Sequence, residues 1–278
     1  MSLVVNTNIG SQIAQRYLYS NSSNLNTAMQ RLSSGLRINS AADDAACLAL
    51  SESISSHVSG SEIAKTNALT GINMLQTAES DLSVIQQNLQ RMRDLSVQAS
   101  NGVYSDSERE MMNTEFQQNK QEIDRIAASS KFAGLNLLDG TATDVTLQVG
   151  TDNDANDQID ITSLFDDAST AGDLSGISAA TITTLATAQS AMASLSAAIT
   201  TISNSRSLMG ASINRLQGTI KRVDSRKENL AAATSVLRDA DIAKESASLT
   251  RLQILQQATT SMLAQANQSP QLALRLLQ

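Results

Sequence analysis

Apolar residues at spacings of four and seven predict that the N-terminal segment is a helix that buries one face. These residues are Leu18, Leu25, Met29, Leu32 and Leu36. A second run, spaced by three and four, goes from Ile72 to Met92 and predicts one long helix from about His57 to Ser100. Two amphipathic helices of different length therefore open the chain.

A turn and a third helix follow the second run. The pair Asn101 and Gly102 is a stop signal, and Ser105 with Glu108 three residues later is typical of a capping box at a helix start. Strand patterns occur only further on, over 145–149 and 159–161. Because an isolated hairpin is marginal in water, we expect this one to lean on the helices.

The longest periodic stretch runs over 185–237 with apolar residues at alternating spacings of three and four. A register sustained this far is specific for coiled-coil packing. Arg206 and Lys227 fall in its seam, where we expect them to restrict register and partner at some cost in stability. A final helix over 249–266 precedes Pro270, the one proline of the chain.

The predicted fold is mostly α, a long antiparallel helical bundle or coiled coil with one small β-hairpin in the middle. Composition agrees with it. The 278 residues include one Pro, 12 Gly, three Tyr, three Phe and no Trp. Few turn residues and few rings disfavour a many-stranded β fold and a thick core.

Charge is spread unevenly within a formal net charge of −7. The stretch 132–205 holds nine Asp and no Lys or Arg, which indicates an exposed acidic insert. No basic patch exists to neutralise phosphates, so we expect no nucleic acid as a partner. In contrast, Arg16 is the only charge in 1–30 and none lies in 252–274, as in surfaces that become buried against protein.

Reactive side chains are scarce. The single His57 and the single Cys47 exclude a zinc site of several Cys and His ligands and an intramolecular disulfide, so we predict no metal and no cofactor. Ten residues apart on a helix, the two fall on different faces, which favours a semi-exposed His and a small apolar Cys. No run of about 18 apolar residues occurs, so we expect no membrane insertion.

Several stretches resemble bacterial flagellins, the subunits of the flagellar filament. They are NTNI at 6–9, QRLSSGLRINSAADDAA at 30–46, LQRMRDLSVQ at 89–98, EIDRIA at 122–127, FAGLNLLDG at 132–140, AA at 231–232, DADIA at 239–243 and ANQSPQ at 266–271. Together they cover about 1–140 and 200–278 in the family's order. The chain is therefore identified by resemblance as a short, two-domain flagellin.

The resemblance implies three parts. Residues 1–45 with 238–278 form an inner domain of paired terminal helices, 46–140 with 178–237 form a rod of long helices, and 141–177 are a short, exposed acidic insert with the hairpin. The implied positions of self-assembly in the inner domain are Ile9, Ile13, Leu18, Leu25, Met29, Leu32, Leu36, Leu252, Leu255, Met262, Leu263 and Leu272.

The implied function is a structural subunit that self-assembles into a helical filament for swimming, without catalysis. Its ends bury too little apolar surface to order alone, so we expect them to fold on assembly. Implied partners are further copies, an export chaperone and the export apparatus, hook-associated junction and cap proteins, and host flagellin receptors. The implied location is the extracellular filament, reached through the export channel without a cleaved signal peptide.

Two receptor footprints also follow from the resemblance. The footprint of the animal Toll-like receptor matches Arg91, Leu95, Glu115 and Gln118, although subunit contact is the more basic role of such positions. The plant-receptor epitope matches residues 30–51. Within it lie Gln30, Arg31, Leu32, Asp43, Asp44 and Cys47, and Cys47 stands where the family usually has Gly.

Three other functions fit parts of the pattern. A hook–filament junction or cap protein shares the terminal helices but usually agrees less well over 32–44 and 267–271. A membrane-active translocator needs an apolar hairpin able to enter lipid, and the sequence has none. A protease insert needs a His-Glu-x-x-His motif, whereas the one histidine, His57, lies outside the insert.

Overall fold

The computed structural model describes residues 7–142, 144–166 and 177–276, which fall into two compact units. The first unit comprises Met1–Ser56 and Asn229–Gln278, and the second comprises His57–Glu228. Helices α2 (Ala45–Ala99) and α5 (Leu185–Arg238) contribute to both. These units reflect contacts within one chain, so the predicted filament domains and their boundaries stay predictions.

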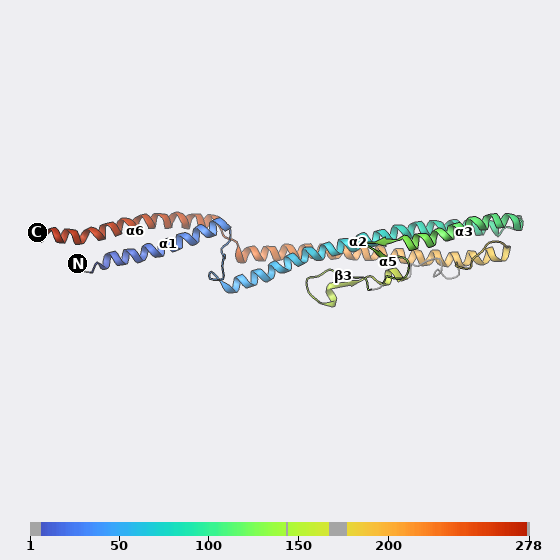
Figure 1. Cartoon of the computed structure of the whole chain (residues 1–278), viewed down its shortest axis with the longest axis horizontal. Helices are drawn as coiled ribbons and strands as arrows, with labels where there is room; N and C mark the ends of the chain where they lie inside the picture. The colour runs from blue at the N-terminus through green and yellow to red at the C-terminus, as the bar shows by residue number, and fades with distance from the viewer. Residues whose placement is uncertain (1–6, 143, 167–176, 277–278) are drawn as a thin grey trace. The chain divides into compact units, whose positions relative to one another are not determined.

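In the first unit, α1 (Ile9–Ser34) lies beside α6 (Ile242–Leu276), so the first and last helices of the chain pair (Figure 1). The pair is antiparallel, because Asn8 hydrogen-bonds Ala266 while Arg31 contacts Glu245. Helix α1 ends at Gly35, which adopts a left-handed conformation with φ of 71° and is typical of a helix C-terminus.

The start of α2 lies well before the predicted start near His57. The Asp44 carboxylate accepts hydrogen bonds from the backbone N–H groups of Ala46 and Cys47, at 3.1 and 2.9 Å. This cap satisfies donors of the first turn and lets the helix begin at Ala45. The final helix also exceeds its prediction, because α6 runs from Ile242 through Pro270 to Leu276.

The link between α1 and α2 and the link between α5 and α6 are joined by backbone hydrogen bonds within the first unit. Leu36 and Asp239 form an antiparallel bridge. The Arg37 N–H donates to the Arg238 carbonyl at 2.7 Å, and the Ala240 N–H donates to the Gly35 carbonyl at 2.9 Å. The chain therefore leaves the terminal pair and returns to it at one point.

In the second unit, α2, α5 and α3 (Asp106–Ser129) share one apolar core, and the predicted capping box of Ser105 and Glu108 is present. Every second position of the register predicted for α5, from Ala188 to Val223, is buried, and Ala191, Ala198 and Ser205 are buried as well although the pattern omits them. The largest fully buried side chains of the three helices include Leu75, Leu82, Ile85, Leu89, Met92, Phe116 and Ile123. The unit thus has the closed core of a helical bundle.

Charged residues of the α5 seam pair with α2 across this unit. Arg206 contacts the Glu79 carboxylate at 2.6 Å, and Lys227 contacts Glu62. Lys65 of α2 in turn contacts Asp224 of α5 at 2.9 Å. The seam therefore compensates its cations with carboxylates, which fixes the antiparallel register.

The predicted hairpin is formed by β3 (Thr146–Gln148) and β4 (Gln158–Asp160), with the 3-10 turn η1 (Ala155–Asp157) leading into β4 and the one-turn helix α4 (Ser163–Asp166) after it. It leans on α2, where Asn67 Nδ2 donates to the Gln148 carbonyl at 3.0 Å. Gly71 leaves room for Leu147, because a Cβ there would lie 2.2 Å from Leu147 Cδ1. Residues 143 and 167–176 of the predicted insert lie outside the described residues.

A smaller hairpin, which the sequence does not predict, pairs β1 (Lys131–Phe132) with β2 (Leu135–Asn136). Ala133 and Gly134 connect the strands with φ of 50° and 88°. Two positive φ values in a two-residue loop are the signature of a type I′ turn. The sequence hides it because Ala replaces the Asn or Asp usual at the first position.

Candidate functional site

The helix pair of the first unit buries little of its apolar surface. The buried residues of α1 are Ser11, Ala14 and Ala28, and Leu252 is buried on α6. Larger side chains at the same helical spacing, among them Leu18 and Leu25, are only half-buried. Two helices alone cannot enclose a row of leucines, so this seam stays open to further packing.

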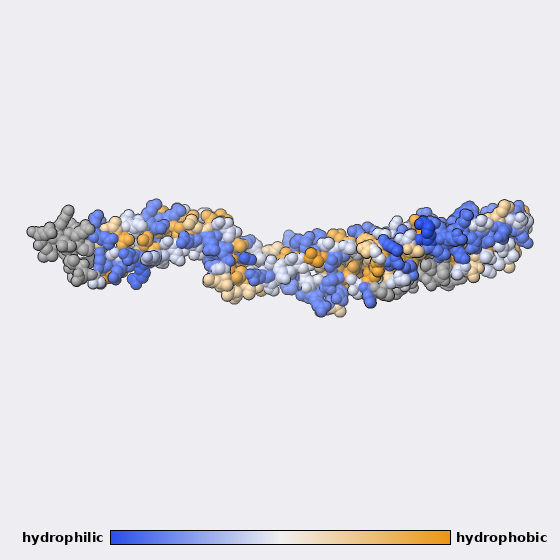
Figure 2. All heavy atoms as spheres, in the orientation of Figure 1, coloured by the Kyte–Doolittle hydropathy of each residue, from blue (hydrophilic) through white to orange (hydrophobic). Residues whose placement is uncertain are grey.

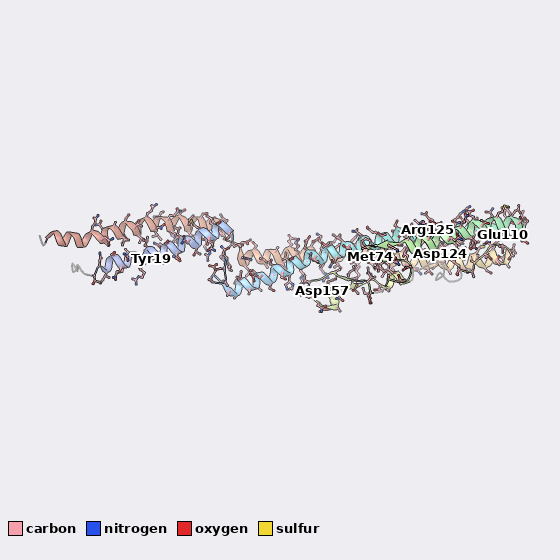
Figure 3. The ribbon with its side chains drawn as sticks, viewed as in Figure 1. Tyr19, Met74, Glu110, Asp124, Arg125 and Asp157 are labelled. Carbon is pink, nitrogen blue, oxygen red and sulfur yellow. The ribbon has the colours of Figure 1, made fainter. Side chains whose placement is uncertain are left out.

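A second row of apolar side chains on each helix points into solvent. On α1, Ile9, Ile13 and Tyr17 follow one another every four residues, and Ile9 is 62% exposed. On α6, Leu255 and Met262 lie seven residues apart, and Met262 is 68% exposed. Figure 2 shows this hydrophobic surface along the terminal pair, and Figure 3 marks the exposed Tyr19 on α1. Contiguous exposed apolar surface marks an interaction site.

Polar contacts cross the seam at intervals along the pair. They are Asn8 Nδ2 with the Ala266 carbonyl at 2.8 Å, Asn21 Nδ2 with Thr259 Oγ1 at 3.3 Å, and Arg31 Nη1 with Glu245 Oε1 at 3.2 Å. Such contacts specify which residues lie opposite one another, and apolar packing alone does so only weakly. The pair therefore has a defined register even though its core is thin.

The structure divides the predicted assembly positions into two groups. The half-buried or buried group is Leu18, Leu25, Leu32, Leu36, Leu252 and Leu263, and the exposed group is Ile9, Ile13, Met29, Leu255 and Met262. The side chain of Leu272 lies outside the described residues. Tyr17 and Ile254 are exposed apolar residues that the sequence analysis missed, although Tyr17 continues the spacing of Ile9 and Ile13.

Comparison with known proteins identifies the family. Residues 5–143 match the bacterial flagellin N-terminal helical region, and residues 192–277 match the bacterial flagellin C-terminal helical region. The chain belongs to the bacterial flagellin family. It is 42% identical to a flagellin of Halalkalibacterium halodurans over 99% of this chain and 100% of that protein.

Two further relatives agree. The flagellar filament 33 kDa core protein of Treponema phagedenis is 39% identical over 99% of this chain and 100% of its own length. The crystal structure of Bacillus cereus flagellin is 30% identical with a TM-score of 0.50, covering 61% of this chain and 94% of that one. As a flagellin, the chain is a structural subunit of the flagellar filament rather than an enzyme.

The residues that the resemblance matches to an animal receptor footprint lie in the second unit and differ in exposure. Arg91 and Glu115 form a bidentate ion pair, with Nε–Oε1 at 2.7 Å and Nη2–Oε2 at 3.1 Å. The hydrogen bond and charge of Glu115 raise the pKa of Arg91. Gln118 is exposed, whereas Leu95 is 2% exposed and belongs to the core. The surface at this place in the flagellin is therefore polar.

The residues that the resemblance matches to a plant-receptor epitope lie at the end of α1, in the link to α2 and at the start of α2. Gln30 is exposed on α1, and Arg31 and Leu32 beside it are half-buried. Hydrogen bonds from the backbone N–H groups of Ser40 and Asn39 hold the pKa of Asp43 below its ordinary value of 3.8. A hydrogen bond from the Cys47 N–H lowers the pKa of Asp44 in the same way.

The lone thiol and the lone imidazole serve separate contacts. The hydrogen bond between the Cys47 side chain and Asp44 raises the pKa of the thiol, which keeps it protonated. His57 Nδ1 instead lies 3.2 Å from Thr151 Oγ1, at the tip of the larger hairpin. Cys47 and His57 therefore have different partners.

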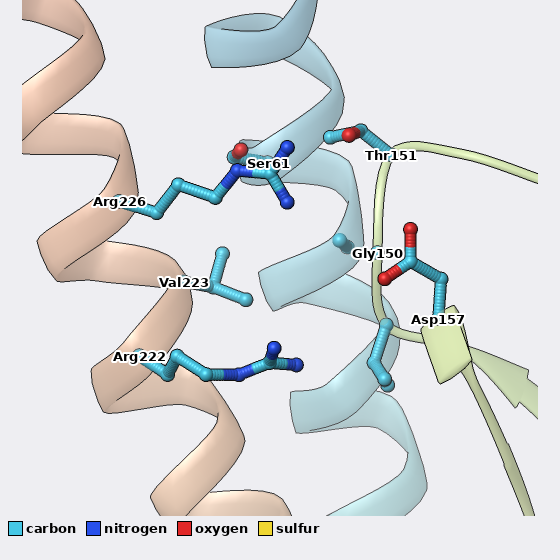
Figure 4. Close-up of a pocket in the computed structure, with 9 residues that line it drawn as sticks. Ser61, Gly150, Thr151, Asp157, Arg222, Val223 and Arg226 are labelled. Atoms are coloured by element: carbon cyan, nitrogen blue, oxygen red, sulfur yellow. The ribbon is translucent and has the colours of Figure 1, made fainter. Parts of the chain in front are cut away.

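Where the larger hairpin meets α2 and α5, Ser61, Thr151, Asp157 and Arg226 help to line a cavity of about 20 Å³ (Figure 4). That space holds about one water molecule. Across 7–142, 144–166 and 177–276, no group of three or more His, Cys, Asp or Glu side chains is placed to hold a metal ion. The helices of the described residues include none long and apolar enough to cross a membrane.

Proposed function

We propose that the paired terminal helices are the contact through which copies of this flagellin assemble into a helical filament for swimming. The supporting observation is the unfinished packing of α1 and α6, which leaves leucines half-buried and Ile9 and Met262 exposed. Side chains of neighbouring copies pack against these half-buried and exposed apolar residues. Because the contact is repeated between different surfaces without closing, it generates a helical polymer.

The same observation supports folding on assembly. The second unit encloses a core of fully buried large side chains, whereas the terminal pair encloses almost none. Short of apolar burial, the pair does not offset the conformational entropy lost on ordering until other copies pack against it. In this proposal, 1–45 with 238–278 act as the inner domain, 46–140 with 178–237 as the rod, and 141–177 as the exposed insert.

Further partners follow from family membership. An export chaperone covers the apolar row of α6 before assembly, and the export apparatus passes the chain through the flagellar channel without a cleaved signal peptide. Hook-associated junction and cap proteins meet the two ends of the filament through the same terminal surfaces. The amphipathic surfaces that these partners need are the exposed rows of α1 and α6.

Host receptors are the remaining partners. Arg91, Glu115 and Gln118 offer the animal Toll-like receptor a polar surface, in which Leu95 has a supporting role beneath. The plant receptor reads the stretch from Gln30 onward. There Cys47 adds a side chain where the family usually has none, and we propose that this weakens plant recognition.

The test of the assembly surface is seeded polymerisation of the purified chain. Met262→Asp places a charge in the exposed apolar row of α6, and Gln257→Asp places the same charge at an exposed polar position of the same helix. Sedimentation and negative-stain imaging should show filaments for the parent chain and the Gln257 variant, and soluble protein for the Met262 variant and for a chain ending at residue 241. Normal assembly of the Met262 variant contradicts the proposal.

A further inference from the structure

The C-terminal helix contains a residue that helices normally exclude. The one proline of the chain, Pro270, lies inside α6, which continues to Leu276. Proline has no backbone N–H, so the carbonyl four residues earlier receives no intrahelical hydrogen bond. In α6 that carbonyl belongs to Ala266. A partly buried carbonyl without a donor lowers stability.

The missing donor comes from the other end of the chain. Asn8 Nδ2 donates to the Ala266 carbonyl at 2.8 Å. The Oδ1 of the same side chain accepts from the Ser11 N–H at 3.0 Å and so caps the start of α1. The helices are close here, since a Cβ on Gly10 would lie 3.9 Å from the Ala266 Cβ. The Asn8 side-chain amide therefore caps the start of α1 and also donates to the α6 carbonyl that lacks its helical N–H.

We propose that Asn8 is a positioning residue for assembly, which fixes the register of α1 against α6 by donating to the Ala266 carbonyl that Pro270 leaves without its helical donor. Pro270 removes a donor from the Ala266 carbonyl, and Asn8 supplies one to the same carbonyl. In the interior of an α-helix a carbonyl normally accepts from the N–H four residues later, so a one-turn slip of α1 would leave Asn8 without this acceptor and Ala266 without the donor that Asn8 supplies. Asn8 and Pro270 together therefore make other registers of α1 against α6 less stable.

The other amide contact across the seam lacks this property. Asn21 Nδ2 lies 3.3 Å from Thr259 Oγ1, and that hydroxyl already donates to the Leu255 carbonyl at 2.6 Å. The Thr259 hydroxyl keeps its partner within α6, so removing Asn21 should cost little stability. Asn21 is thus the control for Asn8, because it is the same residue type and its side-chain amide also contacts α6.

The experiment is a double-mutant cycle on the full chain, read as the critical concentration of seeded assembly. Asn8→Ala should raise it about fivefold, because the Ala266 carbonyl loses the donor that takes the place of the missing Pro270 N–H. With Pro270→Ala, residue 270 regains an N–H and α6 satisfies that carbonyl itself. In this background Asn8→Ala should cost less than about twofold, which remains for the lost cap.

Two variants separate register from capping and from general damage. Asn8→Asp keeps the acceptor for the Ser11 N–H but has no donor for Ala266, so it should behave like Asn8→Ala. Asn21→Ala should have the same small effect with Pro270 and with Ala at 270. The proposal is overturned if Asn8→Ala has equal effects in both backgrounds, or if Asn8→Asp assembles like the parent.

The proposal concerns assembly and so rests on the proposed function, but the two fail differently. If the parent chain does not polymerise with seeds, the assembly proposal fails. Amide hydrogen exchange over residues 9–34 then tests the register alone, and faster exchange with Asn8→Asp than with the parent supports it. Where residues 9–34 are protected in the parent chain, equal exchange of the two chains overturns it.

Discussion

Arg109 makes the sharpest prediction about the second unit. Only 6% of this arginine is exposed, and its guanidinium lies under the turn between α2 and α3. Its Nε donates to the Ala99 carbonyl at 2.8 Å and its Nη2 to the Asn101 carbonyl at 3.2 Å, while Nη1 contacts Asp106 at 2.8 Å. Arg109 thereby satisfies carbonyls at the C-terminus of α2, which have no intrahelical donor.

The cost of removing the guanidinium follows from the burial of each partner. Ala99 is fully buried, and losing a charged donor to its carbonyl costs about 2 kcal/mol. The Asn101 carbonyl belongs to an exposed residue, and its lost bond costs about 0.5 kcal/mol because water replaces the donor. Asp106 is 84% exposed, so that ion pair adds about 0.5 kcal/mol. The expected loss is about 3 kcal/mol.

Urea unfolding followed by far-ultraviolet circular dichroism measures this loss as the change in the free energy of unfolding of the main transition. Arg109→Met keeps the apolar stem and removes the guanidinium, so it should show the full loss of about 3 kcal/mol. Arg109→Lys retains one donor and should lose about half as much. If the free energy of unfolding of the methionine variant is within about 0.5 kcal/mol of that of the parent, the Arg109 guanidinium does not stabilise the C-terminus of α2 as proposed.

Three further outcomes are expected. Gly10→Ala should lower the critical concentration of assembly about twofold, because alanine favours the helix and its Cβ would make ordinary contacts at 3.5 and 3.9 Å; a rise would contradict this. Asp43 and Asp44 have folded pKa values below 3.8, so the stability that they give the link is complete above that pH and is lost as the pH falls through the folded values. Asp43→Asn should therefore reduce the acid-side change in a pH profile of hydrogen exchange in the link, and an unchanged profile would argue against a stabilising role of the hydrogen bonds from Asn39 and Ser40 to Asp43. Arg91→Ala should leave the free energy of unfolding almost unchanged, because its pair with Glu115 is exposed, yet weaken signalling in cells that carry the animal receptor; full signalling would remove Arg91 from the footprint.

Periodicity predicts the long helices because it reports burial directly. The register over 185–237 matches the buried side of α5, and the alternation around Leu147 and Ile159 matches the larger hairpin. Both patterns hold because one face of each element packs on a continuous core. The capping box at Ser105 and Glu108 is likewise local, so four consecutive residues suffice to specify it.

Helix ends that depend on distant or irregular contacts escape such an analysis. The start of α2 is set by the Asp44 cap, and the carboxylate takes that position because the link around it is held by hydrogen bonds to 237–240. Pro270 is a stop signal in sequence, but α6 continues through it, with the Ala266 carbonyl bonded to Asn8. Neither outcome can be read from neighbouring residues.

The candidate surfaces show the same division. Spacing identifies which residues of α1 and α6 are apolar, but only the pairing decides that Leu18 lies in the seam and Ile13 in solvent. Family resemblance groups Leu95 with Arg91, whereas packing places Leu95 in the core. The burial of Arg109 has no sequence signal, since nothing local distinguishes it from a solvated helix arginine.

In the proposed function, the terminal helices complete their packing only between copies. Amide hydrogen–deuterium exchange of the full chain before and after seeded assembly tests it most directly. Residues 9–34 and 242–268 should change from fast to strongly protected exchange on assembly, while buried residues of the second unit such as Leu82 and Phe116 are protected in both states. Terminal helices that exchange equally in monomer and filament would contradict the claim.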